Sequence, residues 1–457
     1  MRALAFLIAA ASLGAQVRLP EYTRETLPNG AVVIVAPRPG VPLVSLQVIV
    51  KGGAESDPPG KGGLASVTAD LLRRGTRART ADQFSDEIDF MGARYATHVA
   101  PEATFVSAEF LSKDAARALD LIGDALLHPA FPEAEVKKAL AERIEQAKAV
   151  KDSPQAAIGA YFQAFFFGPD HPYAHRANGD ELTLARITRA DIAAYHARLY
   201  AAKNLIVVAA GDFEAADMRA QLARAFGAAP AGEAHRWAKD PLPARSATPR
   251  LLLVDRPGSA QTYFRIGNPG ITRTDPDRVP VWLVNTLFGG RFTSMLNDEL
   301  RVNSGLTYGA HSQADENRLT GRVAIATYTR TADTGKAIDL ALEVTRRLRE
   351  KGITAEQLAS AKAYVKGGYP TERLETSEQV AGILGELELF GLGRDDVDGL
   401  FARIDAVTLD QANAAAKKYF GAGNLVFAVV GDASKIREGM RKYAPSVIET
   451  AISKPGF

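Results

Sequence analysis

The sequence of 457 residues contains no cysteine. Disulfides, thiolate nucleophiles, Cys-ligated zinc and lipid attachment through an N-terminal Cys are therefore excluded. An excess of one charge is also missing, because 55 basic residues stand against 53 acidic ones, for a net charge of +2. Such a chain has little basic excess to neutralise phosphates, which argues against nucleic acid as its main partner. Beyond the N-terminus, no apolar run approaches the length of a membrane span.

The N-terminus has the pattern of a secretory signal. Arg2 precedes an apolar run from Ala3 to about Leu13, and small residues follow. The run is too short for a spanning helix, so we expect residues 1–16 to be a signal peptide and the protein to be exported to the periplasm. Two cleavage sites stay open, at Leu13-Gly14-Ala15 and at Ala10-Ala11-Ser12. The alternative is an apolar start that simply packs on the first domain.

The rest of the chain consists of two halves with related patterns. The distance from Thr to the strand-ending Asp is 24 positions in both halves (212 − 188 and 432 − 408), although the Tyr between them is offset by one. Ordered residues at near-equal spacing indicate an internal duplication. The first copy is Ile187-Thr188, Tyr200, Asn204-Leu205 and Gly211-Asp212, and the second is Val407-Thr408, Tyr419, Asn424-Leu425 and Gly431-Asp432.

We therefore predict an α+β protein with two related domains, residues 21–227 and 250–450. A linker over residues 228–249, which contains four prolines, joins them. In each domain we expect a mixed β-sheet packed with helices. The segments of the first half that read as strands are 31–36, 42–51, 93–97, 103–110 and 204–212, and those that read as helices are 115–127 and the stretch through Val136, Leu140 and Ile144.

One glycine-framed segment, from Gly62 to Thr76, is the most informative stretch of the chain. It reads GGLASVTADLLRRGT. It resembles the signature helix of the pitrilysin/insulinase-like zinc peptidases, roughly GLAHFLEHMLFKGT, which carries the inverted zinc motif His-x-x-Glu-His. The frame matches, but the three chemical positions of the motif do not: the first His falls on Ser66, the Glu on Ala69 and the second His on Asp70. The matching positions are Gly63-Leu64-Ala65, Leu72 and Gly75-Thr76.

The resemblance extends over almost the whole chain. It includes Leu27-Pro28-Asn29-Gly30 at a strand start, Gly52-Gly53-Ala54-Glu55-Ser56 before the signature helix, and His171-Pro172-Tyr173. It implies that the two domains form a clam-shell arrangement.

No zinc site is expected in this chain. In the family a Glu on a later helix completes the site, and Glu145 lies in about the right place, 75 positions after Asp70 (145 − 70). Zinc needs three protein ligands and an open position for water, so we expect a lone Glu145 to be a solvated helix residue. Of the seven histidines only His171 and His175 lie close together, and neither a His-Glu-x-x-His nor a Gly-x-Ser-x-Gly motif occurs. We predict no cofactor here and expect zinc in a partner.

The second half carries the residues to which the resemblance assigns chemistry. A glycine turn at Gly289-Gly290 precedes Arg301 and then Gly305-Leu306-Thr307-Tyr308. In the family the corresponding Arg and Tyr reach across to the zinc site of the opposing domain and assist there. A guanidinium offers fixed donors to a peptide carbonyl, and a phenol can donate to a developing oxyanion. We therefore predict Arg301 and Tyr308 as catalytic residues and Gly289 and Gly290 as substrate-binding ones. The alternative is an ordinary surface Arg and core Tyr.

A strand in the first half resembles the family strand that pairs with an extended peptide. This β-augmentation needs mainly backbone groups. We predict that Tyr95, Ala96 and Thr97 bind substrate in this way. The family often has Asn-Ala-x-Thr where this chain has Tyr95-Ala96-Thr97-His98, so an ordinary sheet strand stays an open alternative.

The resemblance implies a non-metal subunit of a heteromeric, exported zinc metallopeptidase. The expected partner is a zinc-binding paralogous subunit, and the expected substrate is a peptide. This chain would be inactive alone and would supply Arg301, Tyr308 and half of the peptide chamber. Two other interpretations stay open: a catalytically inert structural subunit, and a peptide-binding or chaperone-like module that acts alone.

Overall fold

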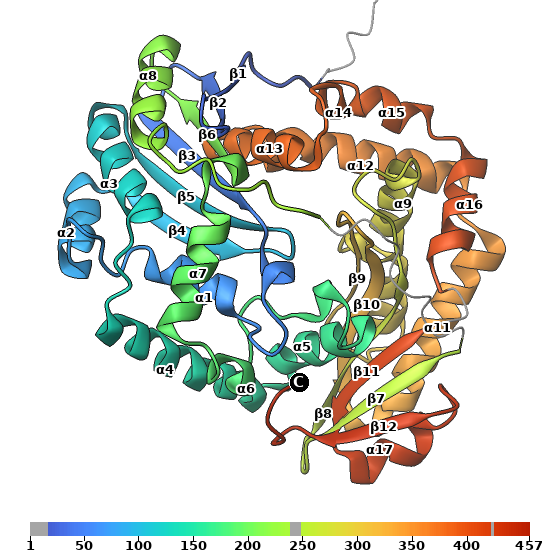
Figure 1. The fold of residues 1–457 in the computed structure, drawn as a ribbon. Coiled ribbons are helices and arrows are strands. Elements are labelled where there is room, and N and C mark those ends of the chain that lie inside the picture. The colour runs from blue at the N-terminus through green and yellow to red at the C-terminus, as the bar shows by residue number, and fades with distance from the viewer. Residues whose placement is uncertain (1–16, 238–247, 422–424) are drawn as a thin grey trace, which may run out of the picture.

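Two six-stranded mixed β-sheets form the framework of the molecule (Figure 1). The computed structural model describes residues 17–237, 248–421 and 425–457, so the predicted signal peptide (1–16) and part of the predicted linker lie outside the described residues. The first sheet has the order β1 (Thr23–Thr26), β2 (Val32–Pro37), β6 (Leu205–Gly211), β3 (Leu43–Lys51), β5 (Ala103–Leu111) and β4 (Arg94–Val99). The second has the order β12 (Val447–Ala451), β7 (Arg250–Asp255), β11 (Val426–Gly431), β8 (Gln261–Pro269), β10 (Arg322–Arg330) and β9 (Ala310–Asp315).

Helices pack against both sheets. Those of the first half are α1 (Leu64–Leu71), α2 (Ala81–Met91), α3 (Ala115–Leu127), α4 (Glu133–Ala149), α5 (Pro154–Phe167), α6 (Glu181–Leu184), α7 (Arg189–Leu199) and α8 (Ala215–Phe226). Those of the second half are α9 (Arg278–Asn285), α10 (Met295–Asn297), α11 (Thr334–Lys351), α12 (Ala355–Arg373), α13 (Ser377–Phe390), α14 (Asp395–Asp398), α15 (Leu400–Ala406), α16 (Leu409–Tyr419) and α17 (Ala433–Met440). No helix of the described ranges is long and apolar enough to cross a membrane.

The duplication predicted from the sequence is present in the fold. In both sheets a parallel pair, β2 with β6 and β7 with β11, is followed by three antiparallel strands. The recurring Thr is a helix N-cap in both copies: Thr188 begins α7 and Thr408 begins α16, each in a capping box that satisfies free N–H groups of the first turn. The sheets differ at one edge, where antiparallel β1 in the first corresponds to parallel β12 in the second. The predicted α+β fold with two related domains is confirmed.

The two halves exchange helices, which the sequence pattern did not reveal. Helix α5 belongs to the first half of the chain but packs against β8 and β11 of the second sheet. Helix α13 belongs to the second half but packs against β3 and β6 of the first sheet (Figure 1). Gly267 and Gly385 permit these contacts, because a Cβ there would lie 2.7 Å from Phe162 Cζ and 2.5 Å from Ile49 Cδ1. Each sheet therefore depends on the other half of the chain for the cover of one face.

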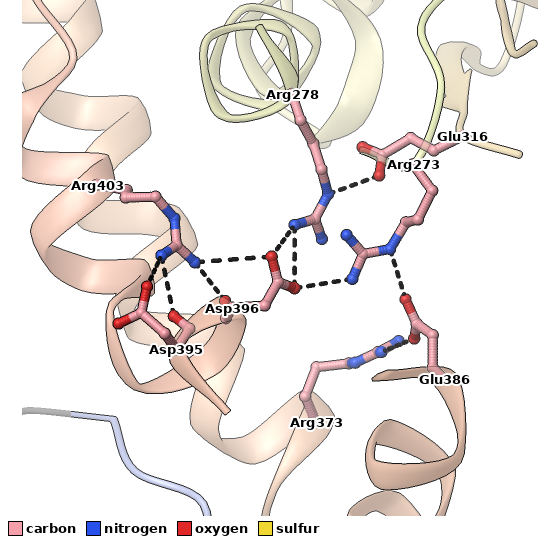
Figure 2. Close-up of polar contacts among 8 residues, drawn as sticks. All are labelled: Arg273, Arg278, Glu316, Arg373, Glu386, Asp395, Asp396 and Arg403. Atoms are coloured by element: carbon pink, nitrogen blue, oxygen red, sulfur yellow. Dashed lines mark hydrogen bonds and ion pairs between the residues drawn. The ribbon is translucent and has the colours of Figure 1, made fainter. Parts of the chain in front are cut away.

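A network of arginines and carboxylates holds the C-terminal part of α13 (Figure 2). Arg273 donates to Glu386 of α13 at 2.9 Å and to Asp396 of α14 at 2.9 Å. Arg278 and Arg403 lie 3.4 and 3.8 Å from the same Asp396 carboxylate. Burial raises the pKa of Asp396, but the hydrogen bond and the charge of Arg273 outweigh it, so the net pKa lies below its ordinary value. The network fixes the exchanged helix to the rest of its own half.

The hairpins at the two sheet edges meet end to end. Glu102, in the turn before β5, accepts hydrogen bonds from the Arg318 backbone N–H at 2.6 Å and from the Tyr173 hydroxyl. That hydroxyl also accepts from the Leu319 backbone N–H at 3.0 Å. The Arg318 guanidinium stacks 4.2 Å from the ring centre of Trp237 and donates to the Leu389 carbonyl of α13. The His171-Pro172-Tyr173 segment thus helps to join the two halves.

Candidate functional site

The signature segment forms the buried helix α1. Gly63 precedes it with φ of 96°, and a Cβ there would lie 2.9 Å from Leu184 Cδ2, so only glycine fits. Asp57 caps the helix by accepting from the backbone N–H groups of Gly63 at 2.7 Å and Ala65 at 2.8 Å. Burial raises the pKa of Asp57 to about 7, although these hydrogen bonds act in the opposite direction. The glycine frame therefore serves to seat the helix, with or without metal ligands.

A guanidinium lies against the positions where the family motif has its ligands. Arg143 of α4 donates from Nη1 to Ser66 Oγ at 2.9 Å and from Nη2 to the Ser66 carbonyl at 3.2 Å. The same side chain lies 4.0 Å from the Asp70 carboxylate, which also pairs with Arg74 at 2.9 Å. Burial lowers the pKa of Arg143, and Asp70 partly offsets this. Sequence reasoning missed Arg143, because nothing in its local pattern shows which face of α4 meets α1.

The Glu145 side chain points away from this cluster. It is 72% exposed and pairs with Lys148 of the same helix at 2.7 Å, as expected for a solvated helix residue. Within the part of the chain that the structure describes, no three His, Asp or Glu side chains are grouped so that they could hold a metal ion.

The predicted peptide-pairing strand, β4, is the edge strand of the first sheet. It pairs with β5, and no other described strand lies on its outer side. Ala96 and His98 are exposed, whereas Tyr95 and Thr97 are half-buried on the opposite face. The Tyr95 ring packs edge-on against Phe84 at 5.2 Å, and burial raises its pKa. The strand thus has the edge position that β-augmentation requires, and the groups that it offers to a partner strand are those of its backbone. Substrate binding by Tyr95, Ala96 and Thr97 stays a prediction.

The glycine turn packs tightly on the edge of the second sheet. Gly289 and Gly290 end a π-helical segment, Thr286–Gly290. A Cβ on Gly289 would clash with Ser312 N and lie 2.6 Å from Ser312 Cβ of β9. Asn285 fastens the turn there, since it donates to the Ser312 carbonyl at 3.1 Å and accepts from the Ser312 hydroxyl at 2.7 Å.

Arg301 and Tyr308 flank a tightly folded loop. Arg301 lies in a second π-helical segment, Asp298–Asn303, and the chain turns back at Gly305 with φ of 61°. The hydroxyl of Thr329 donates to the Leu306 carbonyl at 2.8 Å, which ties the loop to β10. Tyr308 then projects outward with 83% exposure. The Arg301 guanidinium stacks 4.5 Å from the ring centre of Phe292. Among the described residues, no hydrogen bond joins Arg301 to Tyr308.

Tyr308 stands at the wall of a cavity of about 700 Å³. Gly289, Gly290 and Phe292 line the same cavity, whereas Arg301 lies behind Phe292 and does not. A second cavity, of about 510 Å³, lies between the ends of the edge strands β4 and β9. The structure therefore brings three of the four predicted residues of the second half to one cavity and places β4 elsewhere.

Comparison with known proteins identifies the family. The model of insulinase (peptidase family M16) matches residues 32–168, and the model of the peptidase M16 inactive domain matches residues 186–365. The chain belongs to peptidase family M16. An uncharacterized zinc protease of Mycobacterium leprae is 27% identical over 412 residues, which cover 88% of this chain and 91% of that protein. The beta subunit of the mitochondrial-processing peptidase of Blastocladiella emersonii is 23% identical over 63% of this chain and 61% of its own length.

Two solved structures share the fold. A peptidase M16 inactive domain from Pseudomonas fluorescens aligns with a TM-score of 0.84 at 25% identity, covering 90% of this chain and 98% of its own. A protease from Helicobacter pylori aligns with a TM-score of 0.81 at 19% identity, covering 90% and 100%.

The M16 frame implies zinc, but the residues of this M16 chain do not fit it. Ser66, Ala69 and Asp70 offer one carboxylate at most, and the guanidinium of Arg143 brings a positive charge to the same face. A metal cation would have to displace that charge and would find too few ligands. The residues at this position therefore supply no metal chemistry.

Proposed function

We propose that this chain is the non-metal subunit of a heteromeric zinc metallopeptidase of family M16. A paralogous partner with an intact zinc motif would carry the metal, and this chain would supply Arg301, Tyr308 and half of the peptide chamber. The partner, the peptide substrate and the export to the periplasm that residues 1–16 predict all belong to this proposal.

One contrast carries the proposal. The chain's own metal position is closed by Arg143, yet Tyr308 is 83% exposed at a cavity wall. Arg301 has no carboxylate partner among the described residues, and its guanidinium rests on Phe292. A core Tyr or a paired surface Arg would serve the fold alone, whereas these two groups keep free donors. Donors held in a fixed position can stabilise charge that develops on a peptide carbonyl.

Reconstitution tests the proposal. The purified chain is assayed for zinc content and peptidase activity alone and after mixing with a zinc-motif M16 protein of the same source. We expect activity in the mixture only, with one zinc per pair. Arg301→Ala and Tyr308→Phe should each lower kcat/KM of the mixture by about 10²-fold, the usual effect of removing one stabilising donor.

The matched control is Arg330→Ala, which removes an exposed arginine that pairs with Asp333 and should leave the activity of the mixture unchanged. Zinc and activity in the isolated chain would overturn the proposal. An assembled but inactive pair would favour a structural subunit, and peptide binding by the isolated chain without any active pair would favour a binding module.

A further inference from the structure

The cavity beside Tyr308 is basic and aromatic. Strands β8, β9 and β10, the start of α5, the turn from Gly289 to Phe292 and Tyr364 of α12 form its walls. Arg265, Arg291 and His311 line it, and no Asp or Glu of the described residues does. Low-dielectric walls that carry charges of one sign concentrate the field inside a cavity, so this one attracts anions.

Arg265 lies in this cavity without a carboxylate partner. Phe264 and Ile266 of β8 are buried in the core, so the alternating Arg265 faces the cavity side. Among the described residues it forms no ion pair, and its Nε is buried without a hydrogen-bond partner. Burial lowers the pKa of Arg265, Arg322 lowers it further and Asp315 only partly offsets this. A half-buried charge without a partner is costly to the fold, and a bound anion would remove that cost.

Ala326 leaves a gap beside this charge. In the sheet register Ala326 of β10 lies opposite Arg265 of β8 on one side and His311 of β9 on the other. Neighbouring strands lie about 4.8 Å apart, so the backbones of Arg265 and His311 are roughly 10 Å apart with one methyl group between them. A carboxylate between the two side chains could accept from the guanidinium fork and from the imidazole.

Aromatic side chains surround the gap. Tyr263 and Tyr328 stack at 5.2 Å in the next row of the sheet. At the rim, Phe292, Tyr308 and Tyr364 are 69%, 83% and 52% exposed. Single exposed apolar residues are common, but several exposed aromatic rings around one cavity are typical of a surface that binds a partner.

We infer that this cavity binds a peptide carboxylate, with Arg265 and His311 as the anion-binding residues and the aromatic rim as the contact for the neighbouring peptide residues. The inference rests on the proposed function and deepens it, because it names the feature by which the chamber would select its peptides. An acidic side chain and a free C-terminus present the same group, and the test separates them.

The test is isothermal titration calorimetry of the isolated full chain with four peptides of one aromatic-rich sequence. The first has a free C-terminal carboxylate, the second has an amidated C-terminus with an internal Gln, the third has an amidated C-terminus with Glu in place of that Gln, and the fourth has both carboxylates. We expect at least one of the three peptides with a carboxylate to bind more tightly than the neutral peptide, by on the order of tenfold in affinity. The first and third peptides show which source of the carboxylate the cavity prefers.

Variants locate the effect. Arg265→Gln should abolish the preference, and Ala326→Leu should abolish it too by filling the gap without any change of charge. Arg265→Lys should retain part of it. Arg441→Gln, which changes an exposed arginine paired with Glu438, is the matched control and should bind as the unmodified chain does. Thermal unfolding of every variant shows whether it is folded.

Two results would overturn the inference: equal affinity for the four peptides, including no binding of any, or an unchanged preference in folded Arg265→Gln and Ala326→Leu variants. Neither result bears on the proposed function, because the reconstituted pair can cleave peptides without this selection. Conversely, an inactive pair with the carboxylate preference intact would overturn the proposed function and leave the cavity assignment standing.

Discussion

At the scale of single residues, Arg143 explains how the fold keeps a signature helix that has lost its ligands. The face of α1 that meets α4 carries Ser66 and Asp70, which are polar and would be costly to bury without partners. Arg143 supplies donors to the Ser66 hydroxyl and carbonyl and a charge for Asp70. A guanidinium therefore links α1 and α4 across the face where the family motif has its metal ligands.

Asp57, which caps α1, makes the stability of the fold depend on pH. Its pKa in the folded chain is raised to about 7, and an Asp in an unfolded chain has a pKa of about 3.9. Between these values the folded state holds a proton that the unfolded state has lost, so stability falls as pH rises through this window. The limiting slope is about 1.4 kcal/mol per pH unit. Urea unfolding across this range, on the unmodified chain and on Asp57→Asn, measures the effect.

We expect the slope of stability against pH to be less negative in the Asp57→Asn variant by up to that amount, whatever its absolute stability. Thr80→Ala changes the cap of α2 without removing a titratable group and serves as the control, with an unchanged slope. Parallel pH profiles for Asp57→Asn and the unmodified chain would show that the Asp57 carboxyl does not titrate in this window.

Single residues were also where the sequence was least informative. The loss of the zinc motif could be read directly, because Ser66, Ala69 and Asp70 stand in a recognisable glycine frame. Arg143 and Arg265 could not be found, because their importance depends on neighbours from other elements. The packing of the Tyr95 ring on Phe84 could not be foreseen either, since the face of an edge strand that a residue occupies is set by tertiary packing.

At the scale of elements, the strands with β-branched apolar runs were predictable and α5 was not. Strand β3 and helix α3 have almost the predicted bounds, because their patterns match a buried strand and an amphipathic helix. Helix α5 reads PQAAIGAYFQAFFF and is apolar on most sides, so it shows no clear helical stripe. That α5 covers the second sheet depends on contacts between residues far apart in the sequence, which local periodicity does not show.

The glycine turn provides a prediction at this scale. Gly289→Ala places a Cβ against Ser312 N and 2.6 Å from Ser312 Cβ, so either the turn or β9 must shift. We expect the free energy of unfolding to fall by roughly 2–4 kcal/mol, as for other overpacked buried sites. Gly309→Ala is the matched control near the same cavity, because a Cβ there meets nothing within 4 Å, and it should change stability by less than about 0.5 kcal/mol. Chemical denaturation measures both, and similar losses would contradict the steric argument.

At the scale of the whole molecule, the exchanged helices make the two halves interdependent. Phe162 and Phe166 of α5 are buried in one cluster with apolar residues of the second sheet, among them Ala428 and Val430 of β11. Ile383 and Leu384 of α13 are buried in the core that includes strands of the first sheet. A boundary in the sequence is therefore not a boundary in the core.

This interdependence predicts how the chain behaves when divided. Expressed alone, residues 17–237 would expose the apolar face of α5 and leave one face of the first sheet without α13. Residues 248–457 would expose the apolar face of α13 and leave one face of the second sheet without α5. Because each half loses part of its hydrophobic stabilisation and gains an exposed apolar patch, we expect neither to unfold cooperatively by itself. Co-expressed, the two pieces should form a 1:1 complex that survives size-exclusion chromatography and melts in one transition.

Phe162→Ala, which removes a fully buried ring at this contact, should weaken the complex by about 3–5 kcal/mol. A sharp, independent melting transition of either piece alone would show that the halves are separate folding units and that the exchange contributes little.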